Sequence, residues 1–462
     1  MKKPSEKSPR VIDLFSGCGG LSLGFQAAGF DIVSGLDIDQ SAISTASYNL
    51  SWRFGSDASY LCCDIRDISN DELTNFNAQS PLVVIGGPPC QAYSLIGRAK
   101  LRSLGEQREH TRDERGYLFE DFVRVVSDLM PDAVVMENVP ESVDYGGLNV
   151  PEHVSSMLAS IGYQTRWTIL NAADYGVPQA RERVFVVAVR GTRPLNVSFP
   201  NPTHASPVDE LTQLDRRMKR FEGLDYFVHP PRSDDKLEHW ITVEEAFSDL
   251  PSLFPTSSSI YRLYKPSVRL PYKTQAQNDF QRLMRSWYGK GLTAVTGNSF
   301  RRTLRDFPIF ERMTEGDDFT DASLIADQIL AEAVRAQALD PVEHKAEYDR
   351  LRRRIVPPYD RTKFLSKWKK LTRSRPSHTV TAHLGVDTYS HIHPWEPRGI
   401  SVREAARLQS FPDEFLFQGT MSEAFRQIGN AVPPLLAKAV ASEVRKMILQ
   451  ADKGVALDER TG

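Results

Sequence analysis

Residues 11–30, VIDLFSGCGGLSLGFQAAGF, pass from a short apolar strand into a glycine-rich turn and then into a helix. Residues 11–15 are apolar except for Asp13 and begin with two β-branched residues, which predicts the strand. The glycines behind them let a ligand approach the backbone at the start of the helix. The turn is not a dinucleotide fingerprint, because Ser22 stands where a third glycine would fall, and it lacks the lysine of a phosphate loop. The stretch indicates an α/β fold whose first loop binds a ligand without phosphates.

Further candidate strands alternate with helical patterns along the first 190 residues. Leu118, Phe122 and Leu129, for example, are spaced to share one apolar helix face. Strands separated by such helices imply βαβ units, a parallel sheet covered on both faces, and ligand binding at the carboxyl ends of the strands. The candidate strands are 32–38, 60–63, 82–85, 133–136, 167–170 and 184–189.

The pattern changes from residue 191, where prolines cluster and the strand and helix signals become irregular. We therefore expect a first domain over 1–190 and a second over 191–427. Residues 321–339 predict an amphipathic helix within the second. A helix over 432–449 follows Pro433 and Pro434, and its apolar positions fit the periphery of the first domain, which makes 428–462 a returning segment.

The overall composition excludes several classes of protein. The chain has 40% hydrophobic and 25% charged residues, as an ordinary globular protein does. This composition argues against a disordered protein, a collagen, a coiled coil or a disulfide scaffold. No apolar run approaches the roughly 18 residues that span a bilayer, so we expect neither secretion nor membrane insertion. The four cysteines lack zinc-ligand spacing, so no metal is expected, and a reducing cytoplasm fits best.

The net charge of −2 hides an uneven distribution along the chain. Residues 31–80 hold eight acids and two bases, whereas 261–305 and 351–375 each hold ten bases and one acid. Basic side chains among aromatic residues suit a phosphate backbone. A solvated face balanced elsewhere in the fold is an equally good interpretation of the charge alone.

Two acidic residues end strands beside the glycine turn. Asp37 is placed for ribose hydroxyls at the end of the second strand, and Asp64, after the third, for an adenine amino group. S-adenosylmethionine is the economical ligand. A flavin or nicotinamide site, or a purely structural turn, stays open on the pattern alone.

A second group of polar residues follows later strands. Pro88 and Pro89 fix the backbone before Cys90, Glu137 ends the fifth strand, and 179–183 read QARER. A lone cysteine is most often a small buried hydrophobe, and surface salt bridges are the default for Glu137 and the arginines. A thiol, a carboxyl and guanidinium groups at one sheet edge together indicate an activated pyrimidine site.

The chain resembles the DNA cytosine-5 methyltransferases. The residues that carry the resemblance stand in the family's order and cover roughly the first 190 and last 90 residues, whereas 191–374 has no family pattern. They are VIDLFSGCGGLSLGFQAAGF from 11, LDID from 36, CDIRDI from 63, GGPPCQAYS from 86, ENVP from 137, NAADYGVPQARERVFVVAV from 171, RPSHTVT from 375, REAARLQSFPD from 403 and QIGNAVPP from 427.

The resemblance implies a fold and a chemistry. The fold is a Rossmann-like S-adenosylmethionine-dependent methyltransferase sheet with a second, smaller target-recognition domain. Cys90 would add to carbon 6 of a flipped-out cytosine, Glu137 would hydrogen-bond its N3 and amino group, and Arg181 and Arg183 would hold O2 and the nearby phosphate.

Two sets of binding residues follow from the resemblance. The cofactor set is Phe15, Gly17, Gly19, Gly20, Leu21, Asp37, Ile38, Asp64, Ile65, Pro88, Leu118, Asn430 and Val432. The expected DNA contacts are Gln91, Ser94, Arg98, Arg301 and Arg302, of which the first three lie in or beside a polar stretch, 94–116, similar to the family's mobile loop.

We expect a monomeric bacterial enzyme of the restriction-modification kind that acts on duplex DNA in the cytoplasm, with a cognate endonuclease acting separately. Two alternatives stay open. A transfer RNA substrate would keep the fold and the chemistry, but that branch usually lacks so large a basic region. A catalytically inactive DNA-binding homologue would be expected to have lost the catalytic set, which is present here.

Overall fold

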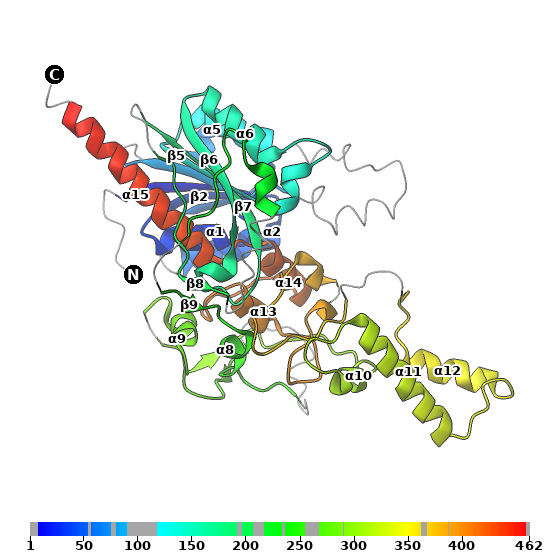
Figure 1. The fold of residues 1–462 in the computed structure, drawn as a ribbon. Coiled ribbons are helices and arrows are strands. Elements are labelled where there is room, and N and C mark those ends of the chain that lie inside the picture. The colour runs from blue at the N-terminus through cyan, green and yellow to red at the C-terminus, as the bar shows by residue number, and fades with distance from the viewer. Residues whose placement is uncertain are drawn as a thin grey trace. The chain divides into compact units, whose positions relative to one another are not determined.

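The structure is a computed structural model in which residues 8–53, 57–74, 80–89, 118–191, 196–206, 217–232, 236–254, 268–289, 291–361, 367–386 and 388–458 are described. The chain forms two compact units. The first comprises Met1–Trp240, Gln409–Phe411 and Ala431–Gly462, and the second comprises Ile241–Leu408 and Pro412–Asn430. The first unit is thus built from both ends of the chain (Figure 1).

A seven-stranded sheet forms the centre of the first unit, with strand order β3-β2-β1-β4-β5-β7-β6. All seven predicted strands are present, with bounds that shift by a few residues at most. They are β1 (Arg10–Leu14), β2 (Asp31–Asp37), β3 (Ser59–Cys62), β4 (Leu82–Gly86), β5 (Ala133–Asn138), β6 (Tyr163–Asn171) and β7 (Glu182–Arg190).

The prediction of a wholly parallel sheet was wrong for one strand. β7 runs antiparallel to both of its neighbours, β5 and β6. The connection over 172–181 holds only the short η6 (Ala172–Tyr175), and a parallel return would need a crossover of a dozen or more residues. As a result, β7 begins at the edge where the parallel strands end.

Apolar side chains leave the sheet alternately toward two helical layers. Val84 and Val134 join one core cluster together with residues of α5 (Leu118–Leu129) and α6 (Val150–Ser160). Val83 and Val135 join the other, together with residues of α1 (Gly20–Ala27) and α15 (Pro434–Asp458). The remaining helices of the sheet region are α2 (Gln40–Ala46), η1 (Ser47–Trp52), α3 (Asn70–Leu73) and η5 (Pro140–Asp144).

The C-terminal helix packs closely against the first helix of the chain. A Cβ atom on Gly24 of α1 would lie 2.3 Å from the Cβ of Ala437 on α15, so only glycine allows this approach. The helix predicted over 432–449 begins at Pro434, a residue type favoured at a first helical position, and runs on to Asp458.

The first unit continues past residue 190, where the sequence predicts a boundary, as far as Trp240. The short strands β8 (His204–Ala205) and β9 (Glu238–His239) pair with each other, and η7 (Lys219–Phe221) lies between them in sequence. The Nε1 of Trp240 donates to Oδ1 of Asp174 at 2.9 Å, which ties this segment to the loop between β6 and β7.

Short elements and buried ion pairs build the second unit. Arg407 is fully buried and contacts the carboxylates of Asp249 (2.7 Å) and Asp413 (2.6 Å). The helix predicted over 321–339 is α11, which starts earlier because Asp318 caps it. The elements are α8 (Val243–Phe247), β10 (Leu270–Pro271), α9 (Asp279–Ser286), β11 (Ala294–Val295), α10 (Phe307–Arg312), α11 (Phe319–Ala336), α12 (Lys345–Ile355), η9 (Ala382–Gly385), η10 (Thr388–Ser390), α13 (Val402–Leu408) and α14 (Met421–Asn430).

Candidate active site

A buried ion pair stands at the carboxyl edge of the sheet. Glu137 is near the end of β5 and Arg183 near the start of the reversed β7, where Asn138 pairs with Val184. The Nε of Arg183 lies 2.9 Å from Oε1 of Glu137, and their side chains are 10% and 11% exposed. Burial raises the pKa of Glu137, and the charges of Arg183 and Arg181 partly oppose this. The site therefore favours a carboxyl that can hold a proton while remaining paired.

Arg181 lies deeper than Arg183 and is 1% exposed. Its guanidinium donates to the carbonyl of Ala431 at 3.1 Å, and its backbone N–H donates to Oδ1 of Asn171 at 3.2 Å. Arg181 thus connects the β6–β7 loop to the returning C-terminal segment. Its charge still acts on Glu137.

Two buried glutamines that sequence reasoning missed complete this connection. Nε2 of Gln179 donates to Oε1 of Gln409 at 2.9 Å, and Nε2 of Gln409 donates to the carbonyl of Ala431 at 3.3 Å. Both glutamines are fully buried. They stand 230 residues apart in sequence, so no local spacing could have indicated their contact.

The segment that leads to the predicted nucleophile lies against Glu137. A Cβ atom on Gly87 would be 3.1 Å from Oε2 of Glu137. The side-chain amide of Asn138 donates to the carbonyl of Pro88 at 3.4 Å. The predicted residues Cys90, Gln91, Ser94 and Arg98 lie outside the described residues, of which Pro89 is the last before them.

The glycine turn after β1 adopts left-handed backbone geometry at several positions. Phe15, Gly17 and Gly19 have φ values of 62°, 53° and 86°, which are unfavourable for most residues other than glycine. A Cβ on Gly20 would lie 2.5 Å from the carbonyl of Val432. The turn is thus packed against the C-terminal segment, and Leu21 is buried behind it.

Asp37 holds this turn from the end of β2. Its two oxygens accept from the backbone N–H of Gly17 and of Asp39, each at 2.8 Å. Burial raises the pKa of Asp37, and these two hydrogen bonds oppose the rise. The carboxylate is therefore fixed in place beside the glycine turn.

The surroundings of Asp37 leave room for a nucleoside. A Cβ on Gly17 would meet no atom within 4 Å. Ile38, the next residue after Asp37, is 72% exposed, although an aliphatic side chain is usually buried. Open backbone, a fixed carboxylate and an exposed apolar surface fit a ribose with its base.

The carboxylate of Asp64, predicted to be available to an adenine amino group, already has a partner in the structure. Both of its oxygens hold Arg66, the closer contact being 2.7 Å, and this hydrogen bond lowers the pKa of Asp64. Its neighbour Ile65 is buried at 2% exposure. A ligand at Asp64 would have to share the carboxylate with Arg66.

The comparisons with known proteins agree with this geometry. The family model described as C-5 cytosine-specific DNA methylase matches residues 9–446. This chain belongs to that family. It is accordingly a DNA cytosine-5 methyltransferase.

Relatives of this methyltransferase cover almost all of its length. A protein of Oceanobacillus iheyensis, by name a type II methyltransferase, is 50% identical over 447 residues, which are 96% of each chain. The type II methyltransferase M.AgeI of Thalassovita gelatinovora is 31% identical over 95% of this chain and 100% of its own. A solved structure titled as a prophage-encoded DNA modification methyltransferase of E. coli superimposes with a TM-score of 0.63 at 23% identity, covering 96% of this chain and 99% of its own, and shares the fold.

The other predicted cofactor residues of the methyltransferase fall in both units. Pro88 is buried after β4, Leu118 is half-buried at the start of α5, and Val432 is buried in the first unit. Asn430 ends α14 and is exposed; it belongs to the second unit.

The two arginines predicted to contact DNA are half-buried in the second unit. The guanidinium of Arg301 donates to the carbonyl of Gly385 and, at 3.2 Å, to Oγ of Ser422. Arg301 therefore already supports the packing of its own unit, and its contact with DNA, like that of Arg302, stays a prediction.

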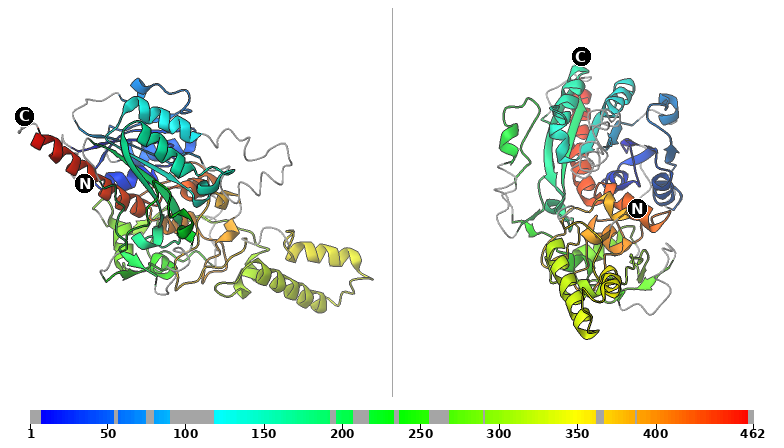
Figure 2. Two further views of the ribbon diagram at one scale, coloured as in Figure 1. Left: turned by 45° about the horizontal axis from the view of Figure 1, so that its top comes forward. Right: turned by 90° about the vertical axis from the view of Figure 1, so that its right-hand side faces the viewer.

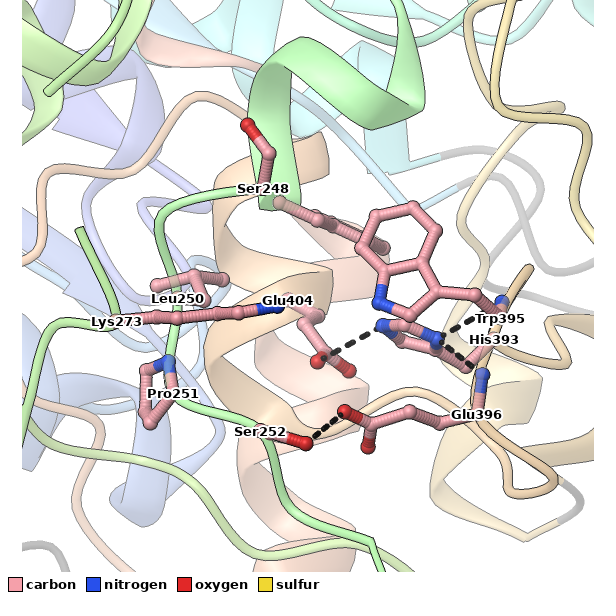
Figure 3. A pocket seen from close by; sticks show the side chains of 10 residues that line it. Ser248, Leu250, Pro251, Ser252, Lys273, His393, Trp395, Glu396 and Glu404 are labelled. Carbon is pink, nitrogen blue, oxygen red and sulfur yellow. Dashed lines mark hydrogen bonds and ion pairs between the residues drawn. The ribbon is translucent and has the colours of Figure 1, made fainter.

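A cavity in the second unit is too small for a base or a nucleoside (Figure 3). Ser248, Lys273, His393, Trp395 and Glu404 are among the residues that line it. Its volume of about 10 Å³ matches a single water molecule. Among the described residues, no group of three or more histidine, cysteine, aspartate or glutamate side chains could hold a metal ion, and no helix is long and apolar enough to cross a membrane.

Proposed function

We propose that this methyltransferase transfers a methyl group from S-adenosylmethionine to carbon 5 of a cytosine flipped out of duplex DNA, with Cys90 as the nucleophile. The observation that carries the proposal is the buried pair of Glu137 and Arg183 beside Gly87 and Pro88. Cys90 is the next residue along the chain.

The cysteine solves a problem of reactivity. Carbon 5 of cytosine is a poor nucleophile, and a bond from the Cys90 sulfur to carbon 6 turns the ring into an enamine whose carbon 5 can attack. When bound, the cofactor would supply an electrophilic methyl group to carbon 5, and its sulfonium sulfur would leave as a neutral thioether. Loss of the carbon 5 proton to a base then breaks the sulfur–carbon bond and restores both the ring and the thiolate.

Glu137 and Arg183 prevent charge from accumulating on the ring during this sequence. Because burial raises the pKa of Glu137, its protonated form can donate to N3 as electrons move into the ring. Arg183 stands beside it at 2.9 Å and would hold the O2 oxygen, where negative charge develops.

The residues around the glycine turn would hold the cofactor. Asp37 offers carboxylate oxygens to ribose hydroxyls, and Ile38 offers an exposed apolar surface to the adenine. Gly20 and Val432 approach each other so closely that the returning C-terminal segment would form part of the same wall.

The base must leave the duplex, because no side chain can reach carbons 5 and 6 inside the stack. Flipping costs a few kcal/mol, which contacts to the DNA backbone offset. We assign target recognition to the second unit and modification of chromosomal DNA in the cytoplasm to the whole chain, as the modification half of a restriction-modification system.

The test compares DNA with RNA as methyl acceptor. Purified protein with isotopically labelled cofactor should produce labelled 5-methylcytosine in genomic DNA and none in transfer RNA, as measured by nucleoside mass spectrometry. Bisulfite sequencing should then place protected cytosines within one short sequence. Label in RNA, or a methyl group on the exocyclic amine, would contradict the proposal.

A further inference from the structure

The second unit carries a helical hairpin, the arm, formed by α11 and α12. The two helices share a small apolar cluster of their own, which contains Leu330, Leu351 and Val356. The first turns of α11 belong instead to a larger core of the unit, through Phe319 and Ala326. The arm extends from the rest of its unit in Figure 1 and in the left-hand view of Figure 2, with its two helices side by side.

The outer face of α12 is basic. Arg350, Arg353 and Arg354 follow the i, i+3, i+4 spacing that places side chains on one face of a helix. All three are exposed, whereas Leu351 and Ile355 face the shared cluster. None of the three arginines makes a salt bridge with another described residue.

The three acids of α11 already have partners other than the arginines of α12. Asp327 pairs with Arg361 at 2.7 Å, and Glu332 pairs with Arg312, also at 2.7 Å. Asp321 completes the capping box at the start of the helix. Within α12 itself, five bases stand against two acids. The connecting segment adds Asp340 and Glu343, which precede the N-terminal end of α12, so the surplus of positive charge lies at the C-terminal end of that helix.

We propose that Arg350, Arg353 and Arg354 form a sequence-independent contact between the arm and the phosphates of duplex DNA. The inference rests on the proposed function only for the identity of the substrate. A guanidinium matches a phosphate in shape and charge, and such contacts orient a protein on DNA without reading its sequence. Complementing the helix dipole explains bases in the last turn only and leaves Arg350 without a role.

The experiment measures the salt dependence of DNA binding by the full chain. Each phosphate contact contributes about 0.9 to the slope of log K against log salt. In the variant Arg350→Gln/Arg353→Gln/Arg354→Gln, the slope on a labelled random-sequence duplex should be smaller by about 2–3. The single variant Arg353→Gln should lower the slope by about one. In both variants, affinity for the DNA sequence that the enzyme methylates and affinity for random DNA should fall by the same factor.

A matched control removes three exposed bases from the first unit, at the edge of the sheet opposite the one that carries Glu137 and Arg183. Arg190 ends β7 next to Asp132, Arg445 lies beside Gly29 just before β2, and Lys446 follows it. Replacing these three with glutamine makes the same change in net charge and should leave the slope unchanged. Both triple variants should melt at the wild-type temperature.

Three outcomes would contradict the proposed contact. They are an unchanged salt slope in the triple arm variant, an equal decrease of the slope in the control variant, or tighter binding of duplex RNA than of duplex DNA. The arm variant should still methylate DNA at low salt. If the wild-type protein did not methylate DNA, the proposed function would be contradicted. The salt slopes would still show whether the arm contacts DNA phosphates.

Discussion

At the scale of single residues, the proposed chemistry depends on the thiol of Cys90, which the sequence alone predicts. Cys90→Ser should abolish methyl transfer, because a hydroxyl is a far weaker nucleophile toward carbon 6, while the affinity for the cofactor should stay near wild type. Radiolabelled methyl transfer and calorimetric cofactor binding measure the two properties. Appreciable turnover by the variant would place the nucleophile elsewhere.

Glu137→Gln should lower kcat by about 10²–10⁴-fold, the usual contribution of a general acid, with little change in cofactor binding. The pH profile is the sharper readout. Because burial raises the pKa of Glu137, the wild-type kcat should fall as the pH rises through this raised pKa, where the carboxyl loses the proton that it donates. The glutamine variant should lose this alkaline limb, and a limb that persists would assign it to another group.

Asp13 is a buried acid outside the proposed chemistry. It is fully buried in β1, its Oδ2 accepts from Ser22 at 2.5 Å, and burial raises its pKa from 3.8 to about 7. The folded state therefore binds the proton more tightly than the unfolded state, so Asp13 lowers the free energy of unfolding as pH rises from about 4 to about 7.

Asp13→Asn should remove that dependence. Relative to wild type, the variant should gain stability over this pH window, by at most roughly 4 kcal/mol. Chemical denaturation at several pH values measures the gain, with the exposed Asp128→Asn as control. A constant difference between Asp13→Asn and wild type would mean that Asp13 stays ionised in the folded protein.

At the scale of elements, the sequence predicted the strands well and the direction of one strand badly. Apolar runs marked every strand of the sheet, because buried strands need them. A run such as 184–189 says nothing of its direction, and only the short connection over 172–181 could have indicated that β7 turns back. That reversal is what brings Arg183 to Glu137.

The contact between α1 and α15 makes a second prediction about elements. Gly24→Val should lower the melting temperature of the first unit, because added carbons would collide with Ala437, and overpacking of this kind costs about 1–3 kcal/mol. Gly291→Val, in open space, serves as control. Equal melting curves for Gly24→Val and wild type would show that the two helices do not need this close approach.

At the scale of the whole molecule, the motifs predicted the family but not how the basic runs are used. Within 261–305, Arg285 is buried against Asp249, and Arg301 holds the carbonyl of Gly385. On α12 the arginines remain outward. A count of charges cannot separate these cases, because burial and pairing depend on contacts between residues distant in sequence, as with Gln179 and Gln409.

The central claim is a transient covalent bond between Cys90 and carbon 6 of cytosine. DNA that contains 5-fluorocytosine tests it most directly, because fluorine at carbon 5 cannot leave as a proton and the adduct stalls. With cofactor present, the account predicts a denaturation-stable complex whose modified peptide contains Cys90, as located by mass spectrometry. An adduct on any other residue, or none from protein that methylates ordinary DNA, would contradict the account.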